Sequence, residues 1–228
     1  MHKFLIVLIL FFTCLTGLAG FDKTEYYEIK QIQGWTIHVN KDLIAEDKLC
    51  SDTLELLGHR LFEVKRVLPE KALQEMQKVP FWVELKDKKP NSCACYHPSR
   101  QWLINNDYNP EKAKSVEISN AKNFLAWSKA QPYMVLHELA HAYHQQVAGH
   151  GNKQINDAYK KAVASKKYEK VLHINGRDQR HYGLNNDKEY FAEATEAYFG
   201  VNDFYPFVKS ELKRHDPDAF AVIKEVWK

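Results

Sequence analysis

The sequence predicts an α+β domain in which a small mixed sheet is followed by a mainly helical C-terminal half. Segments with the alternating apolar pattern of β-strands fall in the first half of the 228-residue chain, and segments with helical periodicity dominate the second half. With 45% hydrophobic residues but only 9 Gly and 8 Pro, the composition is that of a globular protein and not of a disordered or collagenous one. No internal domain boundary is visible, so residues 21–228 are expected to form a single domain.

The predicted strands are short and lie early in the chain. Residues 35–40 (Trp-Thr-Ile-His-Val-Asn) alternate apolar and polar side chains, as a half-buried strand does. Residues 81–85 are a second predicted strand. Shorter extended pieces are expected at 93–96, 102–105 and 116–119.

The predicted helices are longer. Apolar residues recur at helical spacing over 53–77, with a break near Pro69. A strong helix is predicted from Pro132 to about Val147, followed by Gly149 and Gly151 as stop signals. Further helices are expected over 156–168, 187–198 and 207–227, the last with a break near Pro217.

Residues 1–20 differ in composition from the rest of the chain. They contain no acidic residue, begin with a short positive stretch, and continue as an unbroken hydrophobic run from Phe4 to Phe12. This pattern is typical of a secretory signal peptide, here cleaved after Ala19 or Gly20. The alternative is a retained membrane anchor, because the apolar run is near the lower limit for a membrane span. The protein is therefore expected to be secreted, extracellular or periplasmic, with no stable membrane span after cleavage.

Export changes what the four cysteines imply, because disulfides persist in oxidising compartments. Cys14 would leave with the signal peptide, so that Cys50, Cys93 and Cys95 remain. Three cysteines in an exported protein predict one disulfide and one thiol. The pairing stays open between Cys50 with either of the other two and a direct Cys93–Cys95 bridge.

Charge and length exclude several classes of protein. The net charge of +3 is not gathered into long basic runs, so nucleic-acid binding is not expected. No stretch in the middle of the chain is long and apolar enough to span a membrane, and no internal repeat indicates a solenoid. We expect a monomer.

The residues that carry chemistry lie on the helix predicted to start at Pro132. Its sequence His137-Glu138-Leu139-Ala140-His141 places two histidines four residues apart, on one face of a helix. Neutral imidazole is a good zinc ligand, and Glu138, beside the first histidine, can act as a base on a zinc-activated water. The motif alone can arise by chance, so a third ligand is needed to make it specific.

The third ligand has to come from another part of the chain. A metzincin would have Gly at position 144 and His at 147, where this chain has His144 and Val147, so that spacing is excluded. The helix predicted over 187–198 offers Glu189 and Glu193, one turn apart in a sequence rich in aromatic residues and alanine. Unpaired carboxylates would be costly in such a core helix. We therefore expect Glu189 to bind zinc and Glu193 to accept a hydrogen bond from a ligand histidine.

Two alternatives to this ligand set stay open. Glu189, Glu193 and Glu196 could form a solvated acidic face without a metal. An imidazole also suits zinc, so a further histidine could replace the glutamate as ligand. The histidines in question are His150, His173 and His181.

Together these residues resemble the gluzincin metallopeptidases, in particular the branch that contains the catalytic domain of anthrax lethal factor and the clostridial Pro-Pro endopeptidases. That branch pairs the His-Glu-x-x-His helix with a distant helix reading roughly Glu-x-Phe-Ala-Glu, which is Glu189-Tyr190-Phe191-Ala192-Glu193 here. It also has a tyrosine seven residues before the glutamate ligand, the position of Tyr182. The resemblance covers about residues 132–200. Segments 93–103 and 202–207 match no part of it, and specificity for proline does not carry over.

The resemblance implies a zincin-like metallopeptidase domain with one zinc ion per chain, held by His137, His141 and Glu189. It implies a secreted zinc-dependent endopeptidase in which Glu138 takes the proton of a zinc-activated water and Tyr182 donates a hydrogen bond to the oxyanion. A peptide or protein substrate would lie extended in the active-site cleft, beside an edge strand. Residues 116–119 are the expected edge strand.

Two other functions stay open at this point. The same zinc chemistry could hydrolyse amide bonds in cell-wall material. The chain could also be a catalytically inactive binding module that kept the zincin fold. The presence of both Glu138 and Tyr182 argues against the second, since binding alone requires neither.

Overall fold

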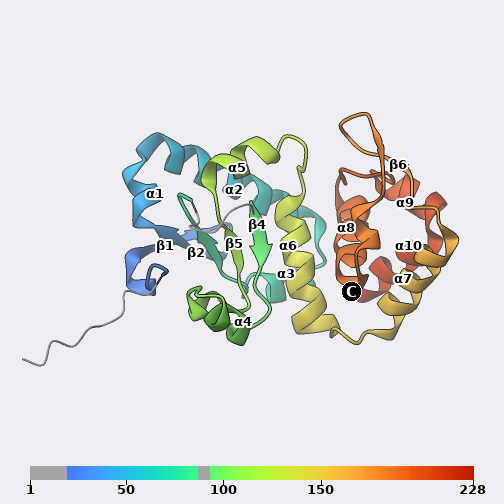
Figure 1. Ribbon diagram of the computed structural model, residues 1–228, viewed down its shortest axis with the longest axis horizontal. Coiled ribbons are helices and arrows are strands. Elements are labelled where there is room, and N and C mark those ends of the chain that lie inside the picture. Colours follow the sequence, from blue (N-terminus) through green and yellow to red (C-terminus); the bar gives the residue numbers. More distant parts are fainter. Residues whose placement is uncertain (1–19, 87–92) are drawn as a thin grey trace, which may run out of the picture.

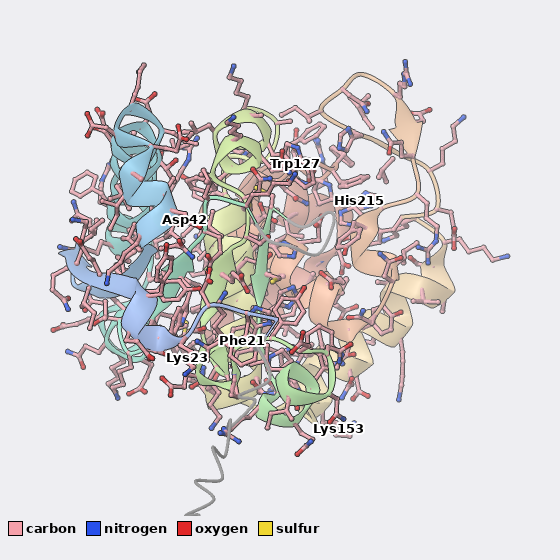
Figure 2. All side chains as sticks on the ribbon, turned by 60° about the vertical axis from the view of Figure 1, so that its left-hand side comes forward. Phe21, Lys23, Asp42, Trp127, Lys153 and His215 are labelled. Carbon is pink, nitrogen blue, oxygen red and sulfur yellow. The ribbon has the colours of Figure 1, made fainter. Side chains whose placement is uncertain are left out.

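The computed structural model describes residues 20–86 and 93–228 (Figure 1). A five-stranded sheet with its helices forms one side of the molecule, and the C-terminal helices form the other. Helix α6 (Met134–Tyr143) lies between the two parts, and side chains fill the space around it (Figure 2). The mixed α+β architecture predicted from the sequence is confirmed. The predicted signal peptide falls outside the described residues except for Gly20, and no helix of the described part is long and apolar enough to cross a membrane.

The sheet has the strand order β1-β2-β3-β5-β4. Strands β1 and β2 form an antiparallel hairpin, whose turn residues Gln33 and Gly34 both have positive φ, 55° and 97°, as a tight hairpin turn requires. The pairs β2–β3 and β3–β5 are parallel, and β4 adds antiparallel to β5. The strands are β1 (Tyr27–Ile32), β2 (Trp35–Asn40), β3 (Phe81–Val83), β4 (Ala94–Tyr96) and β5 (Val116–Ile118).

The structure corrects two of the strand predictions. Strand β5, expected as an edge strand over 116–119, lies inside the sheet between β3 and β4, so the edge next to α6 is β4. Residues 102–105, expected to be extended, belong to helix α4 (Arg100–Asn105). The Ser99 hydroxyl starts this helix, because it accepts a hydrogen bond from the backbone N–H of Trp102 at 3.2 Å.

The helices of the first half cover the sheet. Helix α2 (Asp47–Val67) buries Leu57, Leu61 and Val64 at helical spacing and ends before Pro69, as predicted. Pro69 then sits at the N-cap of the next helix. The remaining elements of this half are α1 (Lys41–Ala45), α3 (Glu70–Met76), α5 (Ala121–Trp127) and the 3₁₀ turns Thr24–Tyr26 and Pro110–Lys112.

Helix α6 is followed directly by a π-helical turn over His144–Ala148, so the helix predicted to run to Val147 changes its geometry after Tyr143. The predicted break near Pro217 is confirmed, because this proline begins a separate last helix. The other elements of this half are α7 (Lys153–Ser165), α8 (Asp187–Phe199), α9 (Lys209–His215), α10 (Pro217–Val226), the hairpin β6 (Val171–Leu172) and β7 (Asp178–Gln179), and the 3₁₀ turn Tyr182–Leu184.

The core joins α6, α8 and the end of the chain around Trp227, which is 1% exposed. The Trp227 ring stacks on Tyr143 of α6 with ring centroids 4.0 Å apart and lies 6.0 Å from the Phe191 ring of α8. Its indole N–H donates to the Thr195 hydroxyl at 3.1 Å. A buried aromatic of this size contributes a large apolar area with its one polar atom satisfied. This contact therefore fixes α6 and α8 against each other.

A second buried cluster is ionic and ties the strands together. The Lys112 ammonium lies 2.7 Å from a carboxylate oxygen of Glu84 and 2.7 Å from one of Glu117. The second Glu117 oxygen lies 2.5 Å from His97 Nε2, and the Tyr27 hydroxyl donates to Glu84 at 2.8 Å. Burial alone would lower the pKa of Lys112, but the two carboxylates outweigh it and raise that pKa. Each buried charge in this network thus has a partner.

No disulfide joins Cys50, Cys93 and Cys95, so the predicted bridge is not formed. For Cys50 the reason is its distance from the other two. The pKa of the Cys50 thiol is affected by the charges of Lys30 and Glu28, so Cys50 lies near strand β1. The pKa of the Cys93 thiol is affected by the charge of Glu138, and Cys93 directly precedes strand β4. Strands β1 and β4 are opposite edges of the sheet, so these two sulfurs cannot meet. The Cys95 sulfur lies 3.6 Å from His97 Nε2.

Replacing Trp227 by alanine should lower the free energy of unfolding by about 3–5 kcal/mol, because it removes a fully buried ring from the α6–α8 contact. Denaturant unfolding followed by circular dichroism measures this loss. Trp102→Ala is the matched control, since Trp102 is 50% exposed on α4 and its loss should cost much less. Equal losses in the two variants would contradict the role given to Trp227.

Candidate metal centre

Three side chains from two helices point at one place. His137 and His141 lie one turn apart on α6, with ring centroids 4.8 Å apart, and Glu189 lies in the first turn of α8. The Glu189 Oε2 atom is 3.2 Å from His137 Nε2 and 3.2 Å from His141 Nε2. Donor atoms bound tetrahedrally to zinc at about 2.0 Å lie roughly 3.3 Å from one another. The three donors therefore fit a single zinc ion by both type and spacing.

Local sequence fixes the start of α8 and so the position of Glu189. The Asn186 side chain caps this helix, accepting hydrogen bonds from the backbone N–H groups of Lys188 and Glu189 at 2.9 and 3.0 Å. A carboxylate in the first turn is also favoured by the helix dipole. Burial alone would raise the pKa of Glu189, but hydrogen bonds from His137 and His141 outweigh it and hold this pKa well below its usual range.

We expected Glu193 to accept a hydrogen bond from a ligand histidine. In the structure, the carboxylate that orients His137 is Glu196. Glu196 Oε1 lies 2.7 Å from His137 Nδ1, whereas the nearest Glu193 oxygen lies 3.8 Å from it, too far for a hydrogen bond. On α8, Glu196 lies within about 20° of the direction of Glu189 and Glu193 within about 40°, so the packing of α8 against α6 decides which of the two meets His137. Glu196 thus follows Glu189 along one face of α8.

Both of these inner carboxylates are buried, which contradicts a solvated acidic face. Glu193 is 4% exposed and Glu196 is 3% exposed. Burial raises the pKa of both, that of Glu193 most strongly, with the charge of Glu196 adding to the effect. For His137, burial acts to lower the pKa, but hydrogen bonds to Glu189 and Glu196 raise it well above 6.5. A cation between α6 and α8 would offset this concentration of negative charge.

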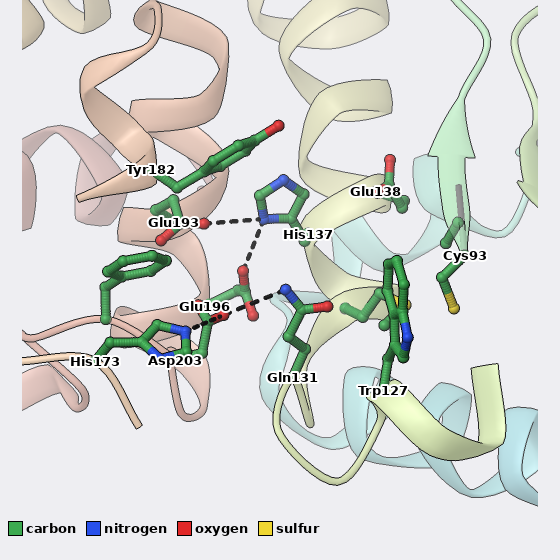
Figure 3. Close-up of a pocket in the computed structure, with 13 residues that line it drawn as sticks. Cys93, Trp127, Gln131, His137, Glu138, His173, Tyr182, Glu193, Glu196 and Asp203 are labelled. Atoms are coloured by element: carbon green, nitrogen blue, oxygen red, sulfur yellow. Dashed lines mark hydrogen bonds and ion pairs between the residues drawn. The ribbon is translucent and has the colours of Figure 1, made fainter. Parts of the chain in front are cut away.

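Glu138 lies on the sheet side of the same helix and is 8% exposed. Its Oε2 atom accepts a hydrogen bond of 2.8 Å from the backbone N–H of Tyr96, in the edge strand β4 (Figure 3 shows Glu138 between α6 and the strand that carries Cys93). Sequence reasoning missed this role of Tyr96, because a backbone group leaves no signal in residue type.

Tyr182 stands on the 3₁₀ turn before α8 and is 47% exposed. Its ring centroid lies 6.4 Å from that of His137, and Figure 3 shows the two rings side by side. The turn is set by His181, whose ring Nδ1 accepts a hydrogen bond from the Gly183 N–H at 3.0 Å. Burial of the ring, with the charge of Glu189, raises the pKa of Tyr182, so the hydroxyl keeps its proton and can donate.

Two cavities of about 430 and 310 Å³ meet at this centre. Both are lined by Ala94, His137, Glu138 and Tyr182. The larger cavity extends toward Trp127, and the smaller one extends past His141. Together they form a cleft with His137 and Glu138 in its middle. Segments 93–96 and 203–204, which had no counterpart in the family resemblance, also line it.

The other histidines of the sequence prediction lie elsewhere. His150 is exposed at the far side of the smaller cavity, His173 lies 3.4 Å from Asp203, and His181 is buried beneath the Tyr182 turn. Within the described residues, none of the three belongs to a group of donor atoms close enough to share an ion. His144, three residues after His141, is completely buried against Phe191.

A known protein family matches nearly the whole chain. A family model described as "Anthrax toxin lethal factor, N- and C-terminal domain" matches residues 21–226. The chain belongs to this family. The resemblance to the lethal factor branch, predicted from the motifs, is therefore confirmed. No curated protein and no solved structure matches the chain. Since the family description names two domains and no activity, membership by itself does not assign a reaction.

Zinc binding should depend on both helices. The purified protein is expected to hold one zinc ion per chain, and Glu189→Ala should strip it, because that change removes the donor 3.2 Å from both imidazoles. His150→Ala is the matched control and should keep the metal. Metal analysis after dialysis measures both, and zinc retained by Glu189→Ala would exclude this ligand set.

Replacing Glu196 should weaken zinc binding more than replacing Glu193. Glu196→Ala should weaken zinc binding about 10- to 100-fold, because His137 loses the partner that fixes its ring. Glu193→Ala should weaken it less. Competition with a chelating dye measures the affinities, and the reverse order would return the orienting role to Glu193.

Proposed function

We propose that this protein is a secreted zinc-dependent endopeptidase with a zincin-like fold. The observation that supports this most is the convergence of Glu189 on the two α6 imidazoles, at the centre of a cleft, with Glu138 beside it. Membership of the lethal factor family agrees with the same reaction. The proposed metal ligands are His137, His141 and Glu189.

Zinc bound there would supply a Lewis acid that polarises the substrate carbonyl and acidifies water. Glu138 acts as the general base and takes the proton of the attacking water. The Tyr96 N–H holds one of its carboxylate oxygens, which leaves the other free for this proton. Glu138 then passes the proton to the leaving amine, so that one carboxylate serves both halves of the reaction.

Tyr182 supplies the second polar contact to the reacting carbonyl. Its ring is half exposed beside His137, and its hydroxyl keeps its proton. A hydroxyl here donates to the oxygen on which negative charge develops, and such donors act more strongly on the transition state than on the substrate.

The substrate is a peptide or protein bound in an extended conformation. Strand β4 takes the place that we expected for residues 116–119, because it is the edge of the sheet next to α6 and lines both cavities with Ala94. An extended peptide can add to such an edge through backbone hydrogen bonds. We therefore place the substrate backbone between β4 and Tyr182.

Hydrolysis of cell-wall amide bonds and an inactive binding module are the alternatives. Incubating the purified protein with unstructured protein and with peptidoglycan, each with a chelator control, separates the three. Cleavage of protein that stops with the chelator supports the proposal. Release of cell-wall fragments alone, or no cleavage of either material, would exclude it.

Glu138→Gln should abolish most turnover while leaving fold and zinc intact. Glutamine keeps an oxygen that can accept the Tyr96 N–H but cannot take up the proton, and loss of a general base costs about 10²- to 10⁴-fold. Glu55→Gln, exposed on α2, is the control for the charge change. Peptide hydrolysis is measured with metal analysis on the same samples; near-native turnover would show that Glu138 is not the base.

Tyr182→Phe should lower turnover about 10²- to 10³-fold, the usual loss for one oxyanion donor, without loss of zinc. Tyr26→Phe is a matched control, because Tyr26 is also partly exposed and donates one hydrogen bond, to Asp42, far from the cleft. Steady-state kinetics on one peptide compare the two variants, and equal rates would remove Tyr182 from the mechanism.

A further inference from the structure

The larger cavity of the cleft is lined mainly by acidic side chains among its ionisable groups. Besides Glu138, its lining contains the carboxylates of Glu193, Glu196 and Asp203. Among the described residues, its lining includes no lysine or arginine, and the basic side chains there are His137 and His173. We call this cavity the acidic pocket.

Asp203 is the acidic residue of this pocket that belongs to neither α6 nor α8, the two helices that carry the proposed metal ligands. It is 4% exposed, and its Oδ2 atom accepts a hydrogen bond from Gln131 Nε2 at 3.2 Å and lies 3.4 Å from His173 Nε2 (Figure 3). Neither partner carries a fixed charge. Among the described residues, the buried carboxylate oxygen of this pocket that has no hydrogen-bond partner belongs to Glu193, whose Oε2 atom is left unsatisfied at a cost in free energy.

Another part of the wall is apolar. Trp127 at the end of α5 is 43% exposed although it borders the pocket, and Met134 and Phe204 also line it. Figure 3 shows Trp127 on the opposite side of Gln131 from Asp203. A long aliphatic chain can pack on such a wall, and a cation is attracted both to aromatic faces and to carboxylates.

The smaller cavity on the other side of His137 differs. Its lining includes Lys188 beside Glu189, and two further histidines, His141 and His150. In the described part of the chain, a fixed positive charge therefore lines the smaller cavity and none lines the larger one. The charge that lines the cleft thus differs between its two sides, and His137 and Glu138 lie where the two cavities meet.

We propose that the acidic pocket binds a lysine or arginine side chain of the substrate, next to the bond that is cleaved. The inference rests on the proposed peptidase function and adds a substrate class to it. The aliphatic stem lies against Trp127, Met134 and Phe204, and the cationic end reaches Asp203. Acidic side chains are rejected by the same charges, which gives discrimination from both attraction and repulsion.

The test uses blocked hexapeptides that are identical except for one residue beside the cleaved bond, which is lysine, norleucine or glutamate. Norleucine keeps the stem and removes the charge. For the zinc-loaded protein, kcat/KM should be at least about tenfold higher with lysine than with norleucine, and lowest with glutamate. Asp203→Asn should reduce the lysine-to-norleucine ratio several-fold. Asp178→Asn, exposed on β7, is the matched control and should leave this ratio unchanged.

Fluorescence anisotropy measures binding of the same peptides to the Glu138→Gln variant. It gives the lysine-to-norleucine ratio of affinities in the absence of turnover. Cleavage and binding that do not favour lysine, or an unchanged ratio in Asp203→Asn, would overturn the assignment of the pocket while leaving the peptidase intact. Tight binding of the lysine peptide that depends on Asp203, with no cleavage of any peptide, would support the pocket and exclude the proposed reaction.

Discussion

The structure depends on one contact, the packing of α6 against α8, and this contact is polar at its centre. Two buried carboxylates on α8 face an imidazole on α6, inside a core that is otherwise apolar around them. Burying such groups is unfavourable unless each finds a partner. The aromatic packing around Trp227 holds the helices together despite this cost. The free energy gained by burying the aromatic rings around Trp227 thus offsets the cost of burying the carboxylates in the same contact.

Much of this centre could be predicted from the sequence, because both helices are strongly periodic. The spacing of His137 and His141 needs only a helix to bring them together, and Glu189 needs only the Asn186 cap to start the second helix where it does. The choice between Glu193 and Glu196 could not be predicted. It depends on how far α8 is rotated and shifted against α6, which spacing within one helix does not contain.

The sheet was less predictable for a related reason. Short strands such as β4 and β5 have correct local patterns, but their order in the sheet is decided by pairing between distant segments. Strand β4 precedes β5 in the chain and lies outside it in the sheet, so the edge that faces the cleft comes from residues whose sequence suggested no function. The strand order also keeps Cys50 away from Cys93, so this predicted pairing required a proximity that the sheet prevents.

The π-helical turn after α6 has a consequence for how this chain could evolve. The π turn takes residues 144–148 out of regular α-helical phase with His137 and His141, and the helix ends at Gly149. Val147 points outward, 44% exposed, and a histidine introduced there would not share the direction of the first two. The α6 segment therefore cannot supply all three metal ligands from one continuous stretch of sequence. The site can be completed only by tertiary structure, and the proposed metal would join segments 52 residues apart, as a crosslink does.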